Sequence, residues 1–475
     1  MLSFEDYRDF DALGLAEAIR SGRMSALEVV EAAIARADGI NPKINAITVR
    51  SFEEARERAK HKLPEGPFAG VPFMLKDLYA FEAGKPIDNG SHFWEGFIPE
   101  VTSTHLERTF ASGLNVIGRT TSSEEGLAIT TETVKHGPTR NPWDLGRTSG
   151  GSSGGAAAAV AAGILPMAGA SDGGGSIRIP AAQCGLFGLK PTRARNSSGP
   201  LIGEGWAGLA INHVVSRSVR DSAAMLDATA GAEPGDPYAC PAQKRPFLDE
   251  VGAPTGKLRI GIHTDGLSGI ALDPENVAAV EEIARLLEEM GHTVELARPT
   301  LDIDAVMEAI ITIICANQWD ALDWGASVMN KPLTGEGLER VTWETALQGA
   351  DYTAADYAKA LTTIHAVGRT LGAFFESYDL LVSTTMATPP FPLGVLRPNE
   401  IGVEGLVEGG KANMPVTQFF NMAGCPAMSV PLCWSLGGLP IGIHIGAGFG
   451  REDTLFRVAA ALEEARPWFH KTPPL

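Results

Sequence analysis

The sequence predicts an α/β fold, with a single large domain built on a mixed, mostly parallel twisted β-sheet that helices cover on both faces. Residues 258–296 have the pattern of a strand, an amphipathic helix and a second strand, and such a βαβ unit makes parallel strands. Helical and strand patterns then continue to the last predicted helix, at 451–465. Hydrophobic residues make up 44% of the 475 positions, which is enough for a large buried core.

The N-terminal part of the chain contains two predicted helix starts. Ser25 and Glu28 form a capping box, in which each side chain accepts the backbone N–H of the other residue. Apolar residues follow at helical spacing, and Gly39 with the sequence Asn41-Pro42 is expected to end this helix. The next predicted elements are a strand over 44–49, a helix capped by Ser51 and Glu54 that runs through Lys62, and a strand within 113–121.

A glycine-rich segment, 141–192, contains two serine-bearing clusters. Residues 150–155 and 173–176 place hydroxyls where side-chain bulk is almost absent, so backbone N–H groups can closely approach a ligand. A flexible linker is not expected, because helix-forming alanines follow the first cluster and apolar residues follow the second. A phosphate loop is excluded because no Gly-Lys-Ser/Thr follows, and a dinucleotide fingerprint because no G-x-G-x-x-G opens the helix.

The C-terminal half supplies most of the evidence for the sheet. Asp273 and Pro274 start the helix of the βαβ unit, and Gly291 ends it before the second strand. The other predicted elements are a mostly helical region over 303–377, strands over 380–383 and 427–432, and a closing amphipathic helix over 451–465.

The composition excludes several function classes. The net charge of -18 argues against binding to a nucleic-acid backbone, which requires clustered Lys and Arg. The five cysteines are scattered and odd in number, and none has the spacing of metal ligands, so we expect a reduced compartment, no metal and no cofactor. Residues 1–10 lack the apolar core of a signal peptide, and no apolar run approaches the roughly 18 residues of a membrane span. A cytoplasmic protein with no membrane partner is therefore expected.

Four stretches of the chain together resemble the motifs of the amidase signature family, and they span nearly its whole length. Residues 150–155 resemble the G-G-S-S-G-G box, and residues 171–180 resemble the box G-S/T-D-T-G-G-S-I/V-R-x-P. Residues 70–77 are similar to G-x-P-x-x-x-K-D, and residues 420–427 to F-N-x-x-G-x-P-A. The chain departs from the family patterns at Ser171, at Gly173 in place of the usual threonine, and at His444 in place of a common glutamine.

The resemblance implies a catalytic relay of two serines and a lysine. Carried onto matching positions, Ser176 attacks the carbonyl carbon, Ser152 in a cis peptide relays its proton, and Lys76 accepts the proton. The glycine loop is implied to supply an oxyanion hole and the residues that support it. Backbone N–H groups of Gly173, Gly174, Gly175 and Ser176 would form the oxyanion hole, and Ser153, Asp172 and Arg178 would support the loop.

Lys76 follows three apolar residues, Phe, Met and Leu. By position alone, such a lysine is more often a surface residue whose aliphatic stem packs on apolar neighbours. In the context of the motif we expect Lys76 to be buried, because loss of hydration lowers the pKa of an amine and makes the neutral form a usable general base.

The substrate pocket is expected to involve a segment that resembles the edge of the family's acyl pocket, 122–131. Gly126 and Leu127 in this segment and Cys315 in the helical region are the expected pocket residues, although an isolated leucine is as often part of the core. The resemblance implies one amidase signature domain over 1–475, with its signature core at about 66–215 and a variable, mostly helical substrate-pocket region at about 300–420.

The sequence therefore predicts a hydrolase that cleaves C–N bonds of neutral amides through a serine acyl-enzyme. The resemblance to bacterial nylon-oligomer hydrolases, aryl acylamidases and urethanases implies aryl, cyclic or synthetic amides and carbamates, with water as co-substrate. Two alternatives stay open: an α/β-hydrolase esterase with Ser152 as nucleophile, since 150–154 also fits G-x-S-x-G, and a glutamine-amidotransferase subunit acting in a complex. The expected partner is a small-molecule amide or carbamate, with no nucleic acid, and the expected assembly is a monomer or homodimer.

Overall fold

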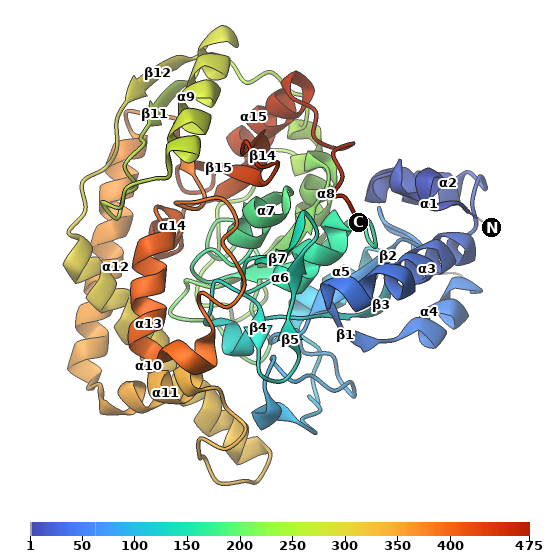
Figure 1. Cartoon of the computed structure of the whole chain (residues 1–475), viewed down its shortest axis with the longest axis horizontal. Helices are drawn as coiled ribbons and strands as arrows, with labels where there is room; N and C mark the ends of the chain where they lie inside the picture. The colour runs from blue at the N-terminus through green and yellow to red at the C-terminus, as the bar shows by residue number, and fades with distance from the viewer. Residues whose placement is uncertain (1, 62) are drawn as a thin grey trace.

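The computed structural model describes residues 2–61 and 63–475. Its centre is an eight-stranded sheet in the order β12-β11-β13-β15-β14-β9-β10-β8. Four of these strands, β11, β12, β14 and β15, are labelled in the upper part of Figure 1. The strands are β8 (Met167–Asp172), β9 (Phe187–Lys190), β10 (Ile211–Ser216), β11 (Arg259–Ile262), β12 (Thr293–Leu296), β13 (Leu380–Thr384), β14 (Ala427–Trp434) and β15 (Pro440–Ala447).

Fifteen α-helices occur among the described residues, and they surround the sheet. In the first half of the chain they are α1 (Phe4–Arg8), α2 (Ala12–Arg20), α3 (Ala26–Ile44), α4 (Phe52–Ala59), α5 (Thr104–Ala111), α6 (Gly154–Ala161), α7 (Arg178–Cys184) and α8 (Val219–Thr229). In the second half they are α9 (Pro274–Glu289), α10 (Ile303–Val328), α11 (Arg340–Asp351), α12 (Ala354–Phe375), α13 (Pro398–Asn413), α14 (Thr417–Ala423) and α15 (Glu452–Ala465).

The fold class is as predicted, but the strand directions are not. The βαβ unit of β11, α9 and β12 is confirmed as parallel, and β11 also pairs in parallel with β13. The other five pairings in this sheet are antiparallel, so the prediction of a mostly parallel sheet is wrong. For β14 and β15 the reason is local, because a tight turn at Ser435 to Leu439 joins them as a hairpin, and a hairpin pairs its strands antiparallel.

Helices cover both faces of the central sheet, as predicted. Leu380 and Val382 of β13 belong to one apolar cluster, which α9 and α15 complete. Leu381 lies between them in the chain and belongs to a second cluster, with α10, α12 and α14. Successive side chains of a strand point to opposite faces, so these two clusters are the two layers on either side of the sheet.

A smaller sheet adjoins the central one and carries Lys76. Its order is β1-β3-β2, in which β3 (Asn115–Thr120) pairs antiparallel with β1 (Ile47–Arg50) and parallel with β2 (Pro72–Lys76). A Cβ atom added at Gly169 of β8 would lie 3.4 Å from the Met74 carbonyl oxygen of β2. The two strands are thus close neighbours, and the end of β2 lies beside the middle of β8.

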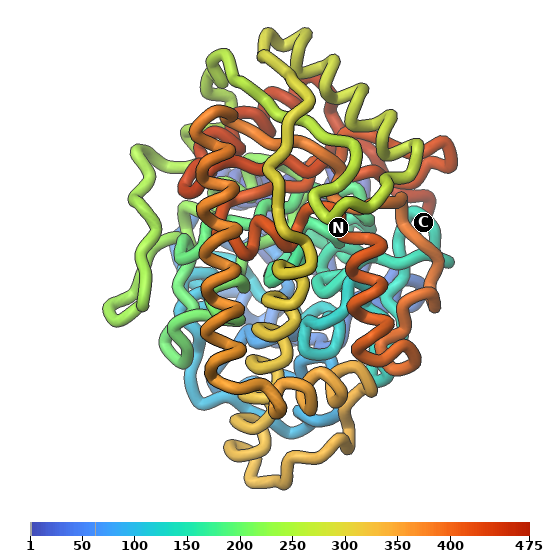
Figure 2. The backbone as a smooth tube through the Cα atoms, turned by 90° about the vertical axis from the view of Figure 1, so that its left-hand side faces the viewer, coloured from blue at the N-terminus to red at the C-terminus, as the bar shows by residue number. Residues whose placement is uncertain are grey.

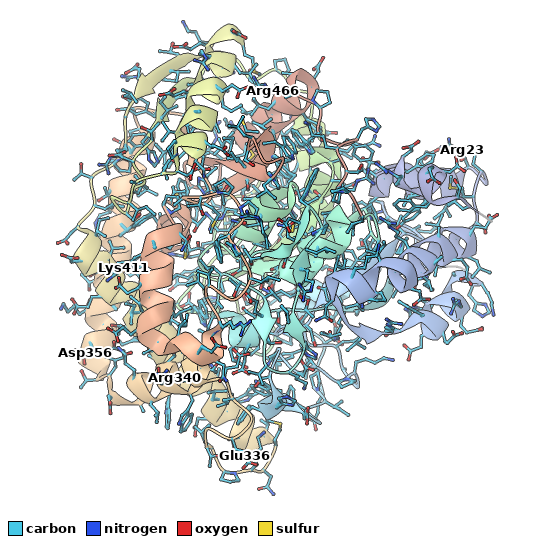
Figure 3. The ribbon with its side chains drawn as sticks, in the orientation of Figure 1. Arg23, Glu336, Arg340, Asp356, Lys411 and Arg466 are labelled. Atoms are coloured by element: carbon cyan, nitrogen blue, oxygen red, sulfur yellow. The ribbon has the colours of Figure 1, made fainter. Side chains whose placement is uncertain are left out.

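Long helices form one flank of the molecule, and this confirms the mostly helical prediction for 303–377. α10 packs against α11 and α12, and α11 packs against α13 (Figures 1 and 2). Charged side chains of these helices, such as Arg340, Asp356 and Lys411, lie at the outer edge of the molecule (Figure 3). In the described part of the chain, α10 alone is long and apolar enough to cross a membrane by length and composition. Its contacts with α11 and α12 are those of a core helix.

The N-terminal helices confirm the predicted capping box but not the predicted helix end. Ser25 and Glu28 exchange both capping hydrogen bonds, and α3 then continues through Pro42. Pro42 lies in the last turn, where it removes only one hydrogen bond, while Ile40 and Ile44 around it are buried. The burial of these two side chains outweighs the lost bond. The second helix, α4, has no side-chain cap from Ser51 and ends before Lys62, which lies outside the described residues.

Candidate active site

Lys76 is the last residue of β2, and its side chain is only 3% exposed. Its Nζ donates a hydrogen bond to Ser152 Oγ at 2.6 Å and another to Ser171 Oγ at 3.0 Å. Burial lowers the pKa of Lys76 from 10.5 to about 7, and the negative charge of Asp172 opposes that decrease. A large fraction of the amine is therefore neutral near pH 7, as a proton acceptor must be. The prediction that Lys76 is buried is confirmed.

Ser152 lies in the glycine-rich turn before α6, and the Gly151–Ser152 peptide bond is cis. The glycines of this turn are closely enclosed. A Cβ atom on Gly151 would lie 2.5 Å from the Thr130 carbonyl oxygen, and one on Gly155 would lie 2.3 Å from Thr121 Oγ1. No larger residue fits without moving that surrounding structure. The segment is therefore a packed turn and not a flexible linker, as predicted.

Ser176 lies in the loop between β8 and α7, and Asp172 at the start of this loop holds it. Asp172 Oδ2 accepts the backbone N–H of Ile177 at 3.1 Å, and Oδ1 forms a fully buried ion pair with Arg178 at 2.8 Å. Burial by itself would raise the pKa of Asp172, but the adjacent Arg178 guanidinium holds it well below its ordinary value. Asp172 is thus ionised, and its ion pair with Arg178 holds the loop in place.

Residues from the C-terminal part of the chain complete this anchor, and this role was not predicted for them. Asn421 Nδ2 donates to Asp172 Oδ1 at 2.8 Å, and Asn421 Oδ1 accepts from Arg178 at 2.6 Å. His444 Nε2 lies 3.0 Å from Arg178, and because arginine only donates, this nitrogen is the acceptor. The stretch resembling F-N-x-x-G-x-P-A was the available clue to Asn421.

The two serines have different surroundings. Ser152 is 1% exposed and bonded to Lys76, whereas Ser176 borders a cavity and, in the described part of the chain, its hydroxyl bonds neither Ser152 nor Lys76. Ser153 bonds the other serine-bearing segment. Its hydroxyl donates to the Ser171 carbonyl oxygen and accepts the Ser171 N–H, both at 3.4 Å, which ties the two serine-bearing segments together.

The loop before Ser176 presents free backbone donors. The N–H groups of Gly174, Gly175 and Ser176 have no acceptor within residues 2–61 and 63–475. Gly175 has a φ of +145°, and a Cβ atom there would lie 2.7 Å from Ile179 Cδ1, so the conformation requires glycine. Consecutive unpaired N–H groups of this kind can stabilise a developing oxyanion.

An apolar cavity of about 120 Å³ adjoins Ser176. Gly126, Leu127 and Cys315, the three predicted pocket residues, all line it, together with side chains from α10, α11 and α13. No Asp, Glu, Lys, Arg or His occurs among its described lining residues. A cavity of about 150 Å³ can bind benzene, so this somewhat smaller cavity is on the scale of one ring or a short alkyl chain.

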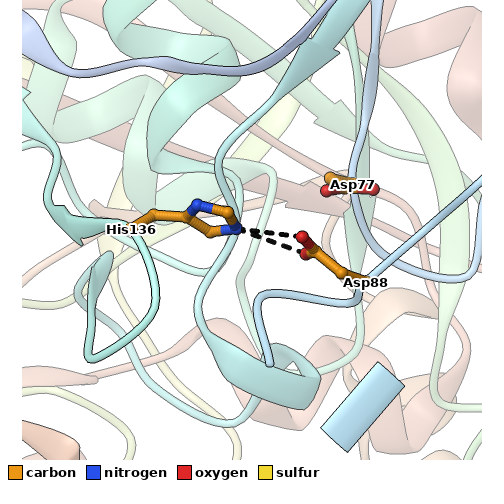
Figure 4. A group of neighbouring side chains, drawn as sticks. All are labelled: Asp77, Asp88 and His136. Carbon is orange, nitrogen blue, oxygen red and sulfur yellow. Dashed lines mark hydrogen bonds and ion pairs between the residues drawn. The ribbon is translucent and has the colours of Figure 1, made fainter. Parts of the chain in front are cut away.

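A second group of titratable side chains includes Asp77, the residue that follows Lys76 in the chain. The carboxylates of Asp77 and Asp88 and the ring of His136 lie within 4.8 Å of one another, with His136 directed at Asp88 (Figure 4). The Lys135 ammonium is 3.0 Å from Asp88, and burial, followed by the charge of Asp88, raises the pKa of Asp77 to about 7. A cation that already neutralises Asp88 and a carboxyl that retains its proton both disfavour a metal ion at this place.

Comparison with known proteins places these features in a family context. A family model described as Amidase matches residues 28–456. The 6-aminohexanoate-cyclic-dimer hydrolase of Pseudomonas sp. (strain NK87) is 37% identical over 477 residues, which cover 98% of this chain and 96% of that protein. A solved structure of 6-aminohexanoate cyclic dimer hydrolase complexed with substrate has a TM-score of 0.92 and 36% identity, covering 99% of both chains. The structure of a bacterial aryl acylamidase of the amidase signature enzymes has a TM-score of 0.87 and 27% identity, covering 97% of this chain and 96% of that chain.

Proposed function

The chain belongs to the amidase family and is an amide hydrolase, and we propose that Lys76, Ser152 and Ser176 carry out its reaction. One observation supports this assignment above the others. A buried lysine with a lowered pKa lies 2.6 Å from the hydroxyl of Ser152, in the turn beside the cavity that Ser176 borders. Lysine is the only base in contact with either serine in the described part of the chain, so the general base is an amine and not an imidazole.

The reaction begins with two proton transfers. Neutral Lys76 takes the hydroxyl proton of Ser152, Ser152 takes the hydroxyl proton of Ser176, and Ser176 Oγ attacks the amide carbonyl carbon. The proton then returns through the same relay to the amide nitrogen, the C–N bond breaks, and an amine leaves. Water attacks the acyl-enzyme by the same steps, which releases the carboxylic acid and restores Ser176.

The N–H groups of Gly173, Gly174, Gly175 and Ser176 stabilise the oxyanion, since none of the four has an acceptor among the described residues. Loss of one such donor typically costs about 3 to 4 kcal/mol of transition-state stabilisation. Asp172 and Arg178 keep the loop in place, because their ion pair is buried and bonded on several sides. Ser153 acts at a distance from the reacting atoms, by fixing the two serine segments to each other.

The cavity favours neutral, apolar acyl or aryl groups. It has no described charged residue to pair with a charged substrate, and burying an unpaired charge costs several kcal/mol. Aryl amides and small cyclic or synthetic amides therefore fit it better than amino-acid amides do. A carbamate carries the same electrophilic carbonyl beside nitrogen, so we include carbamates in the substrate class.

Neither alternative is supported. In an α/β-hydrolase, Ser152 would follow a buried central strand and bond a histidine, but it follows β7 (Asp144–Thr148), which belongs to a two-stranded sheet, and it bonds Lys76. An amidotransferase subunit would act on glutamine, and an uncharged cavity offers no partner for its α-ammonium and carboxylate groups. We propose a cytoplasmic enzyme, monomeric or homodimeric, which agrees with its five free cysteines.

The test is to purify the chain alone and follow release of nitroaniline from neutral p-nitroanilides of increasing acyl size. We expect hydrolysis without any partner protein, and an acyl-enzyme that mass spectrometry locates on Ser176. Ser377→Ala is the matched control, since Ser377 is an exposed serine remote from the relay in sequence and contacts. Acylation at Ser152 with Ser176 unmodified would contradict the assignment.

A further inference from the structure

Three buried glutamates lie behind the wall of the substrate cavity. Glu124 and Glu125 directly precede the cavity residue Gly126, and Glu339 directly precedes α11. Their exposed fractions are 3%, 1% and 2%. Within the part of the chain that the structure describes, no Lys, Arg or His nitrogen lies within 4.0 Å of any of the three carboxyl groups. Buried carboxylates are rarely left without a cation, so these groups need another means of limiting their charge.

The contacts of Glu124 and Glu339 indicate how the charge is limited. Glu124 Oε1 accepts the backbone N–H of Glu339 at 2.7 Å, which places the Glu124 carboxylate at the N-terminus of the 12-residue helix α11. The helix dipole favours a negative charge there. Glu339 Oε1 accepts the backbone N–H of Val134 at 2.8 Å, but Glu339 Oε2 is buried without a partner. A proton on that oxygen would convert it into a donor.

We propose that Glu339 keeps a proton near the Glu124 carboxylate, and that these two residues position the cavity wall for hydrolysis. The inference rests on the proposed function, because it concerns binding in the cavity beside Ser176. Glu124 carries the charge, and Glu339 carries the proton on Oε2. The two residues are positioning residues, since neither reaches the reacting atoms.

The pair connects two elements of the site. The segment that Glu124 begins continues as Gly126 to Ile129 along the cavity, and α11 contributes Thr345 to the same cavity. This segment also touches the relay. Ser123 N–H donates to the Ser152 carbonyl oxygen at 3.2 Å, and a Cβ atom on Gly126 would lie 3.5 Å from Ser152 Oγ. A shift of this segment away from α11 would therefore widen the cavity and alter substrate affinity.

Ionisation of the pair depends on pH. Burial, followed by the charge of Glu124, raises the pKa of Glu339 from 4.5 to about 8. The folded protein thus keeps a proton that the unfolded chain loses near pH 4.5, so the stabilisation falls as pH rises and is lost above about 8. Two adjacent buried carboxylates then repel each other. The expected result is a KM that rises roughly tenfold per pH unit above about 8, because the substrate binds the protonated form.

Three neighbouring groups also titrate or carry charge near the pair. Burial raises the pKa of Glu125 to about 7, but Tyr79 and Trp94 donate hydrogen bonds to its carboxylate, so its ionisation breaks no contact and should affect the wild type and Glu339→Gln alike. His92 faces Glu124 and is paired with Glu95. Lys135, near Val134 in the chain, directs its ammonium to Asp88 and Glu95. None of these groups replaces the proton on Glu339.

The test compares Glu339→Gln with the wild type in KM and kcat for a neutral anilide from pH 6 to 10. Glutamine keeps the acceptor for Val134 and puts a permanent donor in place of the protonated oxygen. We expect the alkaline rise in KM to disappear in Glu339→Gln, with kcat unchanged at pH 7. Glu336→Gln is the matched control, because Glu336 is exposed at the edge of the molecule (Figure 3) and should keep the wild-type profile.

A second measurement keeps the inference separate from the proposed function. Between pH 5 and 8, the midpoint of thermal unfolding of the wild type should decrease relative to that of Glu339→Gln, whether or not any amide is hydrolysed. If that difference appears and no amide is cleaved, the pair stands and the proposed function fails. If Glu339→Gln does not fold, Glu124→Gln takes its place and should likewise flatten both profiles. A KM that rises equally in the wild type and in the folded variant would overturn the inference.

Discussion

Replacing Lys76 by methionine or arginine should abolish hydrolysis, and the structure gives the size of the effect. Burial lowers the pKa of Lys76 from 10.5 to about 7, so about half of the amine is neutral at pH 7, against roughly one part in three thousand for an ordinary lysine. This difference corresponds to about 5 kcal/mol. Methionine has no basic group, and arginine cannot lose its proton. We therefore expect kcat to fall by at least ~100-fold in both variants, the usual contribution of a general base.

The assay is the pH dependence of kcat/KM from pH 5 to 10. In the wild type, log kcat/KM should rise with unit slope up to about pH 7, because only the neutral amine accepts the proton, and it should then stay level until the rise in KM above about pH 8 lowers it. A histidine would titrate in nearly the same range, so the profile must be read together with the variants. Replacing any one of the ten histidines should leave turnover within about tenfold.

The pH dependence of folding stability provides an internal control for the Lys76 variants. Between pH 7 and 10.5 the unfolded chain binds a proton at this lysine that the folded protein does not, so stability should rise with pH in the wild type. Lys76→Met should fold, lack this rise and still be inactive. An active Lys76→Arg, or a histidine variant that folds but loses a thousandfold in kcat, would refute a lysine-based relay.

Other changes test the remaining parts of the site. Ser176→Ala should lose hydrolysis and fluorophosphonate labelling together; labelling that persists there and vanishes in Ser152→Ala would make Ser152 the nucleophile. Neutral aryl amides and carbamates should have a higher kcat/KM than glutamine and asparagine amides, and a ranking led by glutamine would contradict this. Leu127→Asp should raise KM for a neutral anilide at least tenfold, since it adds an unpaired charge to the cavity. Arg178→Ala should lower the free energy of unfolding by roughly 3 to 5 kcal/mol in a denaturant titration, because it leaves Asp172 buried without its cation; a loss under 1 kcal/mol would show that the pair is dispensable.

The parts of the fold that were predictable are those governed by local sequence. The capping box of Ser25 and Glu28 and the start of α9 at Asp273 depend on residues within one helical turn, and both are present. The direction of most strands was not predictable, because β8, β9 and β10 pair through contacts distant in sequence. The predicted end of α3 was wrong for a related reason. The helix continues past Pro42 because Ile44 is buried in the core, and this is a tertiary contact.

The same distinction holds for the site. Lys76, Ser152 and Ser176 lie in motifs that can be read from the chain, and the cavity does contain Leu127 and Cys315. Asn421 joins Asp172 from a position 249 residues away, and no local pattern gives that contact. The environment of Glu124 depends in the same way on Glu339, which is distant in the chain and adjacent in space.

Asp172 and Lys76 show that burial alone does not decide the charge of a group at this site. Both side chains are almost completely buried, at 0% and 3% exposure, and burial disfavours the charged form of each. Asp172 keeps its charge because Arg178 and Asn421 bond it directly, whereas Lys76 is bonded only by two hydroxyl groups, which cannot offset its lost hydration. The partners of each residue therefore produce an ionised anchor and a neutral base a short distance apart. Arg178→Ala should therefore reduce the negative charge on Asp172. Because that charge limits the decrease in the pKa of Lys76, the pKa of Lys76 should then fall further.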